Sequence, residues 1–321
     1  MDKAKNLLLS LIKNISSVLT SLRLHRLIPC RREIYNFLFE KLWTGGNIIE
    51  IQGSKMDINM KEKDPMMRQT FQTYALSSSW EEDTTKLFEK IVKKGDVVID
   101  MGANIGYFTL LSARLVGSEG RVFSFEPNPK NFEYLNKNIR LNDYKNVNAE
   151  QKAVSNVNGK TKLFICPYDS GHHTINKADG VEAYRLGRKG KVESIEVETV
   201  TLDEYLKNKT DRVDVMKIDV EGAEALSFKG MEETLNNNKN VKIFLEFFPL
   251  LIEKMGSSPK EFVGFLLQNF NVFVIGHDYS MKKFNKNYLK INKYEELANL
   301  TEGYSDHLNL LLTKDEGYIF N

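Results

Sequence analysis

The sequence predicts an α/β protein built on a doubly wound, mostly parallel sheet, and three observations carry that prediction. Segments with strand and helix patterns alternate over about two hundred residues, as they do in doubly wound folds. Several strand segments are unbroken apolar runs, of which residues 97–99 are one, and such runs are typical of strands covered on both faces. A turn of small residues at 102–106 joins the first of these strands to a helix, at the end of the sheet where such folds bind ligands.

The first 45 residues differ from the rest of the chain in charge and in pattern. They carry a net charge of +5, which leaves −3 for the remainder of a chain whose total is +2. Apolar residues between positions 8 and 22 recur at steps of three and four, which predicts an amphipathic helix. Two interpretations stay open. The apolar stripe packs on the rest of the chain or on a second subunit, or it lies on an anionic membrane surface.

Composition and length exclude several classes of protein. The longest uncharged run of the amphipathic segment is nine residues, whereas a membrane-spanning helix needs about twenty. Lys13 interrupts any secretory leader, so we expect a cytoplasmic protein, with peripheral contact to the inner membrane surface as the alternative. Cys30 and Cys166 lie far apart, which excludes a disulfide framework and a thiolate zinc site. The 45 basic and 43 acidic residues are too balanced to indicate nucleic-acid binding.

The elements before residue 95 form an appendage and the first helix of the main domain. Alternating apolar residues around Gly53 predict a β-hairpin over 49–60, and polar, mixed sequence with no predicted element continues to Trp80. Residues 81–93 predict a helix with one apolar side. We therefore divide the chain into a helical and hairpin appendage, 1–80, and a main domain, 81–321.

The main domain alternates strands and helices almost to its end. Apolar or alternating runs predict strands at 97–99, 122–125, 147–154, 163–166, 194–200, 213–218, 241–247, 272–275 and 308–312. Helical periodicity predicts helices at 107–116, 129–141, 223–236 and 259–269, and a helix start at 201–204. A long polar loop occupies 167–191, and residues 277–305 match no pattern.

The loop after the first strand of the main domain indicates its ligand. A nicotinamide-binding loop needs G-x-G-x-x-G, but after Gly102 this chain has Asn104 and Tyr107 at the positions of the second and third glycines. Asp100 lies just before the loop, where an acid suits a cationic ligand better than a pyrophosphate. S-adenosylmethionine carries an ammonium and a sulfonium. The loop therefore favours S-adenosylmethionine, and Gly106 lets the backbone approach it closely.

Two later strands add to that ligand site. Glu126 follows the second strand, 26 residues beyond Asp100, where an acid hydrogen-bonds the hydroxyls of an adenosine ribose. The third strand leads into Ala153 and Val154, whose small apolar side chains suit an adenine. Each residue alone has a purely structural alternative, but three such features at successive strand ends favour a binding role.

A second group of acidic residues follows the strands at 213–218 and 241–247. Asp219, Glu221 and Glu246 lie at strand ends that face the same edge of the sheet. Three acids there can bind an ammonium, act as a general base or hold a divalent cation, so the metal requirement stays open. We interpret Glu224 as a helix-start residue and Lys217 as the partner of a neighbouring acid.

Histidines offer a further candidate base. His172 and His173 lie in the polar loop, and His173 is the better candidate for a general base near neutral pH. Two adjacent loop histidines are more often simply exposed to solvent. His277 and His307 border strand-like runs without evident partners, and we interpret both as structural.

Six motifs in register resemble those of the FkbM-like methyltransferases. They are DMGANIG at 100–106, FEPNP at 125–129, LxxNIxxN at 135–142, AVS at 153–155, TLD at 201–203 and KIDVEGAE at 217–224. The resemblance covers roughly residues 95–248. Residues 1–45, 167–191 and 277–305 lie outside it, and we expect the acceptor to be recognised there.

The resemblance implies a class I methyltransferase fold with a seven-stranded sheet, S-adenosylmethionine as cofactor, and O-methylation of a glycan, a lipid-linked sugar or a secondary metabolite. The cofactor-binding residues it implies are Asp100, Gly102, Ala103, Asn104, Gly106, Glu126, Ala153, Val154 and Asp219. Asp219 and Glu221 would lie near the transferred methyl group, and with His173 they are the candidate catalytic residues.

Three other functions stay open. A nucleic-acid methyltransferase shares the fold, although the charge of −3 on residues 46–321 disfavours it, and we expect no nucleic-acid partner. A nicotinamide oxidoreductase lacks its glycine pattern here. A non-catalytic cofactor-binding module would not need the acidic residues Asp219, Glu221 and Glu246 at the strand ends. The oligomeric state is open too.

Overall fold

A computed structural model describes most of the chain. The described residues are 46–59, 65–76, 79–165, 173–175, 193–276, 288–301 and 307–315, with Leu11, Phe37, Phe39, Lys41 and Trp43. Most of the predicted amphipathic helix, His172 and His277 lie outside them. The chain divides into two compact units, Met1–Trp80 and Glu81–Asn321, and each is considered by itself. Among the described residues, no helix is both long and apolar enough to span a lipid bilayer.

The first unit contains the predicted hairpin. β1 (Ile48–Ile51) pairs antiparallel with β2 (Ser54–Asp57), and Ile49 lies opposite Met56. Gln52 and Gly53 connect them with φ of 50° and 71°. Two positive φ values are the signature of a type I′ turn, whose twist matches that of the flanking strands.

The first unit also contains a helix that the sequence analysis did not predict. α3 (Pro65–Leu76) lies in the stretch taken as polar and without structure. Its buried side chains, Met67, Phe71 and Tyr74, recur at steps of four and three, and Tyr74 packs against Trp80 with ring centroids 5.4 Å apart. The apolar stripe was present in the sequence, but it is narrow and surrounded by polar residues.

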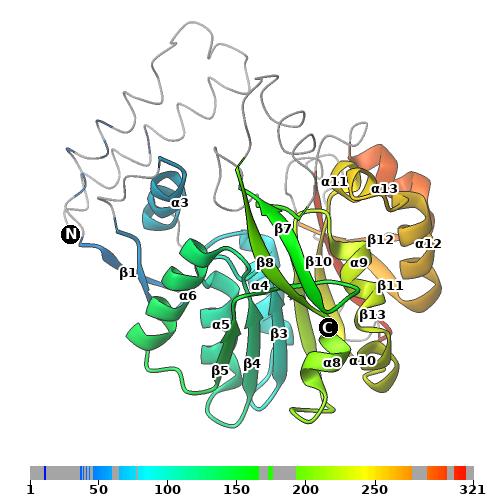
Figure 1. The fold of residues 1–321 in the computed structure, drawn as a ribbon, viewed down its shortest axis with the longest axis horizontal. Helices are drawn as coiled ribbons and strands as arrows, with labels where there is room; N and C mark the ends of the chain where they lie inside the picture. The colour runs from blue at the N-terminus through cyan, green and yellow to red at the C-terminus, as the bar shows by residue number, and fades with distance from the viewer. Residues whose placement is uncertain are drawn as a thin grey trace, which may run out of the picture. The chain divides into compact units, whose positions relative to one another are not determined.

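The second unit is organised around a sheet of eight strands in the order β12-β11-β13-β10-β9-β3-β4-β5. Figure 1 shows this sheet with helices around it. The strands are β3 (Val97–Met101), β4 (Arg121–Phe125), β5 (Val147–Glu150), β9 (Val215–Ile218), β10 (Lys242–Phe247), β11 (Asn271–Ile275), β12 (Tyr288–Ile291) and β13 (Leu308–Thr313). β5, β4, β3, β9 and β10 pair in parallel, whereas β13 and β12 pair antiparallel with their neighbours. The predicted fold class is confirmed. The sheet has one strand more than the predicted seven, because β12 lies in the region where no pattern was found.

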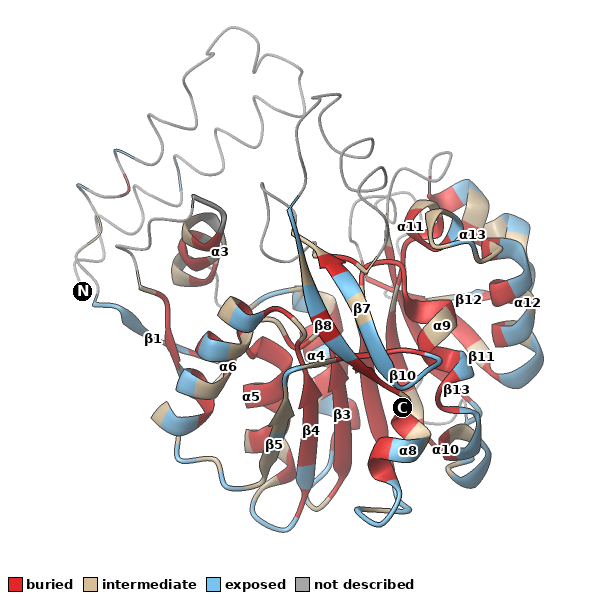
Figure 2. Ribbon diagram, viewed as in Figure 1, coloured by how far each residue is buried: buried red, intermediate tan, exposed pale blue. Residues whose placement is uncertain are grey.

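Helices bury both faces of this sheet, which explains its unbroken apolar runs (Figure 2). The helices of the unit are α4 (Glu82–Ile91), α5 (Tyr107–Val116), α6 (Pro129–Leu141), α8 (Leu202–Leu206), α9 (Glu224–Lys229), α10 (Glu232–Asn237), α11 (Pro249–Lys254), α12 (Pro259–Asn269) and α13 (Tyr294–Leu300). On one face Ile99, Met216 and Leu245 join a cluster with residues of α8, α9, α12 and α13. On the other face Phe88 of α4 contacts Phe244, with ring centroids 5.0 Å apart.

Two predicted elements are divided in the structure. The strand expected over 147–154 is β5 in the main sheet and β6 (Lys152–Val154) in a separate sheet, which also contains β7 (Gly159–Phe164) and β8 (Ser194–Val200) in the order β6-β8-β7. The helix expected over 223–236 is α9 followed by α10. They separate at Gly230, where a Cβ atom would lie 2.0 Å from the backbone oxygen of Ser155. A tertiary contact therefore interrupts the helix.

Candidate active site

The predicted site residues follow parallel strands, so they meet at one edge of the main sheet. β3, β4, β9 and β10 point the same way, and their carboxyl ends carry Asp100, Glu126, Asp219 and Glu246 respectively. This is the edge at which doubly wound sheets bind ligands.

The glycine loop packs directly on the second group of acids. Gly102 has φ of +82°, and a Cβ atom there would lie 1.7 Å from the backbone oxygen of Asp219. The backbone N–H groups of Gly102 and Ala103 both donate to the carbonyl of Phe125 at 2.9 Å. Only glycine permits this approach, and the loop and Asp219 are consequently parts of one site.

The rest of the loop turns into α5 through two further residues of positive φ. Asn104 has φ of 50° and Gly106 has φ of 104°. A Cβ atom on Gly106 would lie 2.8 Å from the side chain of Leu135 on α6. An asparagine tolerates this left-handed conformation better than most residues. The sequence Gly-Ala-Asn-Ile-Gly therefore matches the backbone that the loop adopts.

Asp100 lies beneath the loop and is buried, with 2% of its surface exposed. Thr109 of α5 donates a hydrogen bond to its carboxylate at 2.5 Å and contacts Ser124 of β4 at 2.9 Å. Burial raises the pKa of Asp100 to about 6, although the hydrogen bond from Thr109 opposes that rise. Asp100 therefore ties the loop to the start of α5 from within the protein.

Glu126 lies beside the same loop and is held by backbone donors. Its two carboxylate oxygens accept hydrogen bonds from the N–H groups of Asn104 and Asn128, each at 2.8 Å. Burial raises its pKa to about 7, against the effect of these bonds. The side chain of Asn131 adds a third hydrogen bond. A carboxylate has about four lone-pair positions, so acceptor capacity for a ligand hydroxyl remains.

Ala153 and Val154 belong to the second sheet and not to the strand next to Glu126. Both are buried, and Val154 lies in the main apolar cluster. Ser227 of α9 donates to the backbone oxygen of Val154 at 3.1 Å. These contacts fix β6 against α9. The proposed contact of these two residues with an adenine stays a prediction.

A buried lysine lies at the centre of the acidic group. Lys217 is in β9 with 2% of its side chain exposed, and its ammonium lies 3.2 Å from Asp219 and 4.0 Å from Glu81. Phe108 presents its ring to the same ammonium at 5.1 Å. Burial lowers the pKa of Lys217, but the surrounding carboxylates outweigh that effect and raise it. The lysine is therefore a permanent cation inside the protein.

Asp219 and Glu246 form a hydrogen-bonded pair of carboxyl groups with opposite pKa shifts. Burial acts to raise the pKa of Asp219, but Lys217 and the hydrogen bond with Glu246 hold it below its ordinary value. Burial, and then the negative charges of Asp219 and Glu221, raise the pKa of Glu246 well above the ordinary value. One proton shared by the pair, mainly on Glu246, follows from these shifts. His307 approaches Glu246 from the start of β13, with Nε2 3.5 Å from Oε1.

Glu221 lies in a strained turn between β9 and α9. Its φ is 52°, in the left-handed region that side chains other than glycine rarely adopt, and Gly222 follows with φ of 99°. Glu224 supports this turn by accepting the N–H groups of Val220 and Gly222. Strain of this kind is concentrated at functional sites.

Residues 173–175, the described part of the polar loop, contact the turn that carries Glu221. Thr174 donates its hydroxyl to the backbone oxygen of Glu221 at 2.7 Å and is buried. His173 is its neighbour in the chain, so its backbone lies close to the segment that carries Glu221. Of the three candidate catalytic residues, Asp219 and Glu221 are brought together directly, and His173 comes from a loop anchored beside them.

The buried ammonium of Lys217 disfavours a divalent metal among the acids. Within the described residues, Asp219, Glu221 and Glu246 are the one group with potential ligand atoms all within 4.8 Å. The ammonium of Lys217 already lies beside Asp219, and Asp219 and Glu246 are joined through a proton. A divalent ion would have to displace that proton and lie next to a fixed cation.

Lys217 pairs with the neighbouring Asp219, as the sequence predicted, whereas the contact of His307 with Glu246 was not predicted and Glu246 was named only as a third acid. A signal was present for Lys217, because a lysine within the buried run Val215–Ile218 requires a counter-charge. The contact of His307 had no such signal. It depends on the antiparallel pairing of β13 with β10, in which Asn309 lies opposite Glu246.

Known proteins resemble the chain across this region. A family model described as Methyltransferase FkbM domain matches residues 100–281, more than half of the chain. Methyltransferase sdnD of Sordaria araneosa is 31% identical over 157 residues, 42% of this chain and 60% of that protein. Hexuronic acid methyltransferase AglP of Haloferax volcanii is 28% identical over 158 residues, 49% of this chain and 59% of that protein. The matches span about three fifths of the length of these relatives.

A solved structure of Methyltransferase FkbM from Methylobacillus flagellatus KT aligns with a TM-score of 0.40 at 11% identity, over 77% of this chain and 54% of that one. The family model extends from Asp100 to beyond Glu246, so it includes both the glycine loop and the acidic group. On that match, the chain belongs to the FkbM methyltransferase family.

Proposed function

We propose that this protein transfers a methyl group from S-adenosylmethionine to a hydroxyl of a small molecule or glycan. The observation that carries the proposal is the contact of Gly102 with the backbone of Asp219. It joins the predicted cofactor loop to the acids that can act on an acceptor. Membership of the FkbM family supports the same chemistry.

The residues of the loop suit the cofactor. S-adenosylmethionine, when bound, supplies a methyl group activated by a sulfonium. Glu126 lies against Asn104 at the carboxyl end of β4 and keeps acceptor capacity for the ribose hydroxyls. The acids around the site favour a cationic ligand over a pyrophosphate.

Asp219 is the proposed general base. A hydroxyl is a weak nucleophile, so its proton must be removed as the new bond forms. Lys217 keeps Asp219 ionised, and Glu246 holds it in place by a hydrogen bond. Glu221 is the second candidate, and His173 is the third.

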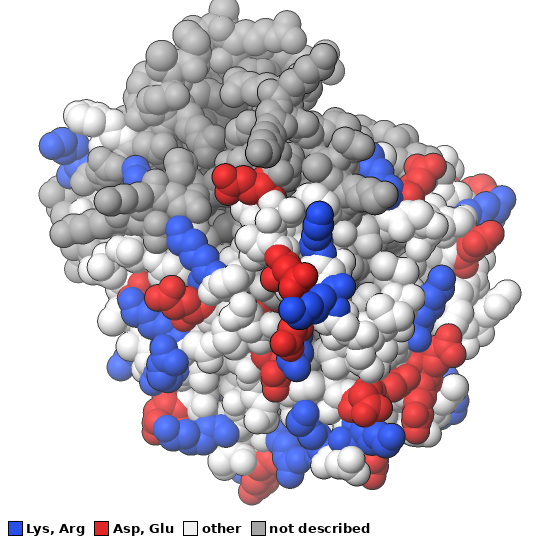
Figure 3. Space-filling view, viewed as in Figure 1, with Lys and Arg blue, Asp and Glu red and all other residues white. Residues whose placement is uncertain are grey.

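The acceptor we propose to test first is a hexuronic acid, because a relative with 28% identity is named a hexuronic acid methyltransferase. A nucleic-acid acceptor is disfavoured by charge. On the face drawn in Figure 3, basic and acidic side chains are interspersed among the described residues. Ion pairs on the protein surface include Lys160 with Glu196, at 2.7 Å.

Calorimetry and single-turnover assays test the proposal. We expect S-adenosylhomocysteine to bind and NAD and NADP not to bind. Glu126→Gln should weaken S-adenosylhomocysteine by about 2–3 kcal/mol, the effect of losing a hydrogen bond to a charged group. The matched control is Glu150→Gln, at the carboxyl end of the neighbouring strand, where the acid accepts a hydrogen bond from Tyr205 instead. Equal affinity in all three proteins would overturn the cofactor assignment.

The assignment of the base has its own test. With a hexuronic acid that is methylated, Asp219→Asn should lower the single-turnover rate by about 10²–10⁴-fold, more than it lowers cofactor affinity. Glu221→Gln and His173→Gln are compared under the same conditions. A full rate in Asp219→Asn would transfer the role to whichever of the other variants is slow. Addition of a chelator should leave the wild-type rate unchanged.

A further inference from the structure

His307 lies where a proton could leave the acidic group. It directly precedes β13, and β13 runs antiparallel to β10, so the start of β13 lies at the carboxyl end of β10. Its Nε2 is 3.5 Å from Oε1 of Glu246. The side chain of His307 is 35% exposed, whereas that of Glu246 is 12% exposed. The histidine therefore reaches solvent from a position in contact with a largely buried carboxyl.

Glu246 connects this histidine with Asp219. The two carboxyl groups are hydrogen-bonded to each other, which requires a proton between them. On its other side Asp219 meets the ammonium of Lys217 at 3.2 Å. The four side chains therefore form a line in the order Lys217, Asp219, Glu246 and His307. The buried cation lies at its inner end, and the histidine lies at its outer, solvent-exposed end.

We propose that His307 accepts, through Glu246, the proton that methyl transfer releases. The proposal rests on the proposed function. His307 acts through Glu246, which it contacts at 3.5 Å, so it is a positioning residue for the proton on Glu246.

The proton balance needs no further reactant. The acceptor oxygen forms its bond to the methyl carbon as the carbon–sulfur bond breaks, and its proton passes to Asp219. In the same step Glu246 gives its own proton to Nε2 of His307 and accepts a hydrogen bond from Asp219 in its place. The imidazolium releases the proton to solvent, and the shared proton of the pair is restored.

Charged groups act on both ends of this line. Lys217 from β9 disfavours an additional proton on Asp219 at the inner end. The negative charges of Asp219 and of Glu221, from the turn after β9, raise the pKa of Glu246 and keep a proton on it. Once Asp219 takes the proton of the acceptor, its own charge no longer holds that proton, and the pair can give it up to His307. The neutral ring of Phe248 lies beside His307 at 6.0 Å.

Titration of His307 by NMR tests the shared proton without any acceptor. The chain has five histidines, and the imidazole signal of His307 is the one missing in His307→Gln. In Asp219→Asn, Glu246 no longer shares a proton with a second acid and ionises beside the histidine. We expect the midpoint of His307 to rise by about half a pH unit or more. If Asp219 and Glu246 were independent charges, removing one would lower the midpoint, and a lower or unchanged midpoint would overturn the proposal.

A control variant separates this effect from packing. Phe248→Leu changes the ring beside His307 but leaves Asp219 and Glu246 intact, so the midpoint should stay within about 0.2 pH units of wild type. A shift as large as that in Asp219→Asn would show that the signal reports packing, and the proposal would fail. Thermal melts of each variant confirm that it is folded.

Single-turnover rates provide the second measurement, with the hexuronic acid that the wild type methylates. His307→Gln should slow methyl transfer by about tenfold or more at neutral pH without a change in KM. In the wild type the rate should rise with pH around the midpoint that NMR gives for His307, and in His307→Gln this rise should be absent. Added imidazole should restore part of the rate in His307→Gly. A wild-type rate and pH profile in His307→Gln would overturn the proposal. If S-adenosylhomocysteine does not bind and no acceptor reacts, the proposed function fails, and the NMR titration still decides whether the proton is shared.

Discussion

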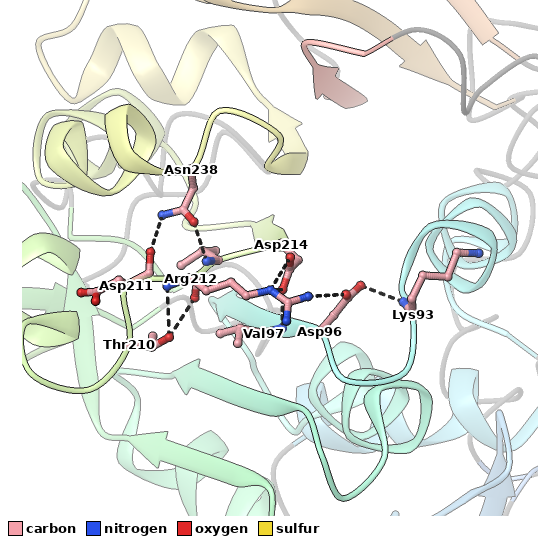
Figure 4. A network of polar contacts seen from close by, with 9 residues as sticks. Lys93, Asp96, Val97, Thr210, Asp211, Arg212, Asp214 and Asn238 are labelled. Carbon is pink, nitrogen blue, oxygen red and sulfur yellow. Dashed lines mark hydrogen bonds and ion pairs between the residues drawn. The ribbon is translucent and has the colours of Figure 1, made fainter.

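The two ends of the parallel sheet carry the same kinds of side chain and use them differently. At the amino ends of β3 and β9, Asp96 and Asp214 flank Arg212 (Figure 4). Asp96 accepts the N–H of Lys93 and Asp214 accepts the N–H of Val97, each at 2.8 Å, and the guanidinium of Arg212 contacts both acids. Each carboxylate accepts from its own backbone N–H and both share Arg212, so the network links the start of one strand to the start of the next.

At the carboxyl ends the acids are arranged around one another. Asp219 and Glu246 share a hydrogen bond, and Lys217 is the cation that lies between these two acids and Glu81. An acid at a strand end is therefore a weak indication of a site by itself. What distinguishes the two ends is the burial of the cation that the acids share, because the side chain of Arg212 is 60% exposed and that of Lys217 is 2% exposed.

Lys217→Met should produce the largest loss of stability, because it removes the buried charge on which the carboxyl end depends. Breaking one partner of a buried ionic group costs about 3–5 kcal/mol. The free energy of unfolding in urea at pH 7 measures the loss. Lys260→Met, whose side chain is 71% exposed beside Glu295, should change it by less than about 0.5 kcal/mol. Equal effects of the two variants would mean that the carboxyl end does not depend on its lysine.

Glu224→Gln should change how stability depends on pH, because burial raises the pKa of Glu224 from 4.5 to about 7. A raised pKa means that the folded protein prefers the protonated carboxyl. This contribution to stability is present below pH 4.5 and is lost as the pH rises through 7. The amide keeps an oxygen for Val220 and Gly222 but never ionises, so the variant should exceed wild type by about 3 kcal/mol at pH 8 and by about 1 kcal/mol at pH 5.

Urea unfolding at both pH values measures this difference. Glu232→Gln, exposed on the next helix, should show the same stability as wild type at pH 5 and at pH 8. A parallel pH dependence of wild type and Glu224→Gln would contradict the assignment of the raised pKa to this carboxyl.

Local patterns were sufficient to predict most elements of the sheet. α5, α6, α12 and β8 have the predicted bounds, because each combines strong periodicity or alternation with a clear start or stop. β12 and α13 were not found, since they are short and follow a stretch without pattern. The junction of α9 and α10 depends on the approach of Gly230 to Ser155, a contact that no local pattern encodes.

The residues of the site show the same contrast between local patterns and tertiary contacts. Gly102, Asn104 and Glu126 were predicted from residue types that the loop and the strand end require. The pairing of Glu246 with His307 was not, because it joins residues 61 positions apart through the pairing of two antiparallel strands. The positions of groups within one strand–turn–helix unit could therefore be predicted from the sequence, their roles in binding stay predictions, and contacts that depend on strand order were not predicted.

Gly102→Ala and Gly95→Ala compare the two ends with the same substitution. Both glycines have nearly the same φ, +82° and +83°. Placing alanine in this conformation should therefore cost the same at each position, about 1 kcal/mol. At Gly95, before β3, nothing lies within 4 Å of the added Cβ, but at Gly102 the backbone oxygen of Asp219 lies at 1.7 Å. Overpacking should cost Gly102→Ala about 2 kcal/mol more.

Calorimetry with S-adenosylhomocysteine extends that comparison to function. Gly102→Ala should bind at least about tenfold more weakly, and Gly95→Ala should bind like wild type, since only the first moves the loop against Asp219. Similar stability and similar affinity in Gly102→Ala and Gly95→Ala would mean that the loop and the acids do not form one site.

Asp214→Asn should have the smallest effect, and on stability alone. The two carboxylate oxygens of Asp214 accept one hydrogen bond from the N–H of Val97 and one from Arg212. Asparagine has one side-chain oxygen and an NH₂ group that cannot accept, so one of these two hydrogen bonds is lost. We expect a decrease of about 1–2 kcal/mol in the free energy of unfolding, because Asp214 is partly exposed. Affinity for S-adenosylhomocysteine should stay within about twofold of wild type, since β9 separates this residue from Asp219. A folded Asp214→Asn that had lost cofactor binding would show that the amino-end network also positions the site, and the functional separation of the two ends would no longer hold.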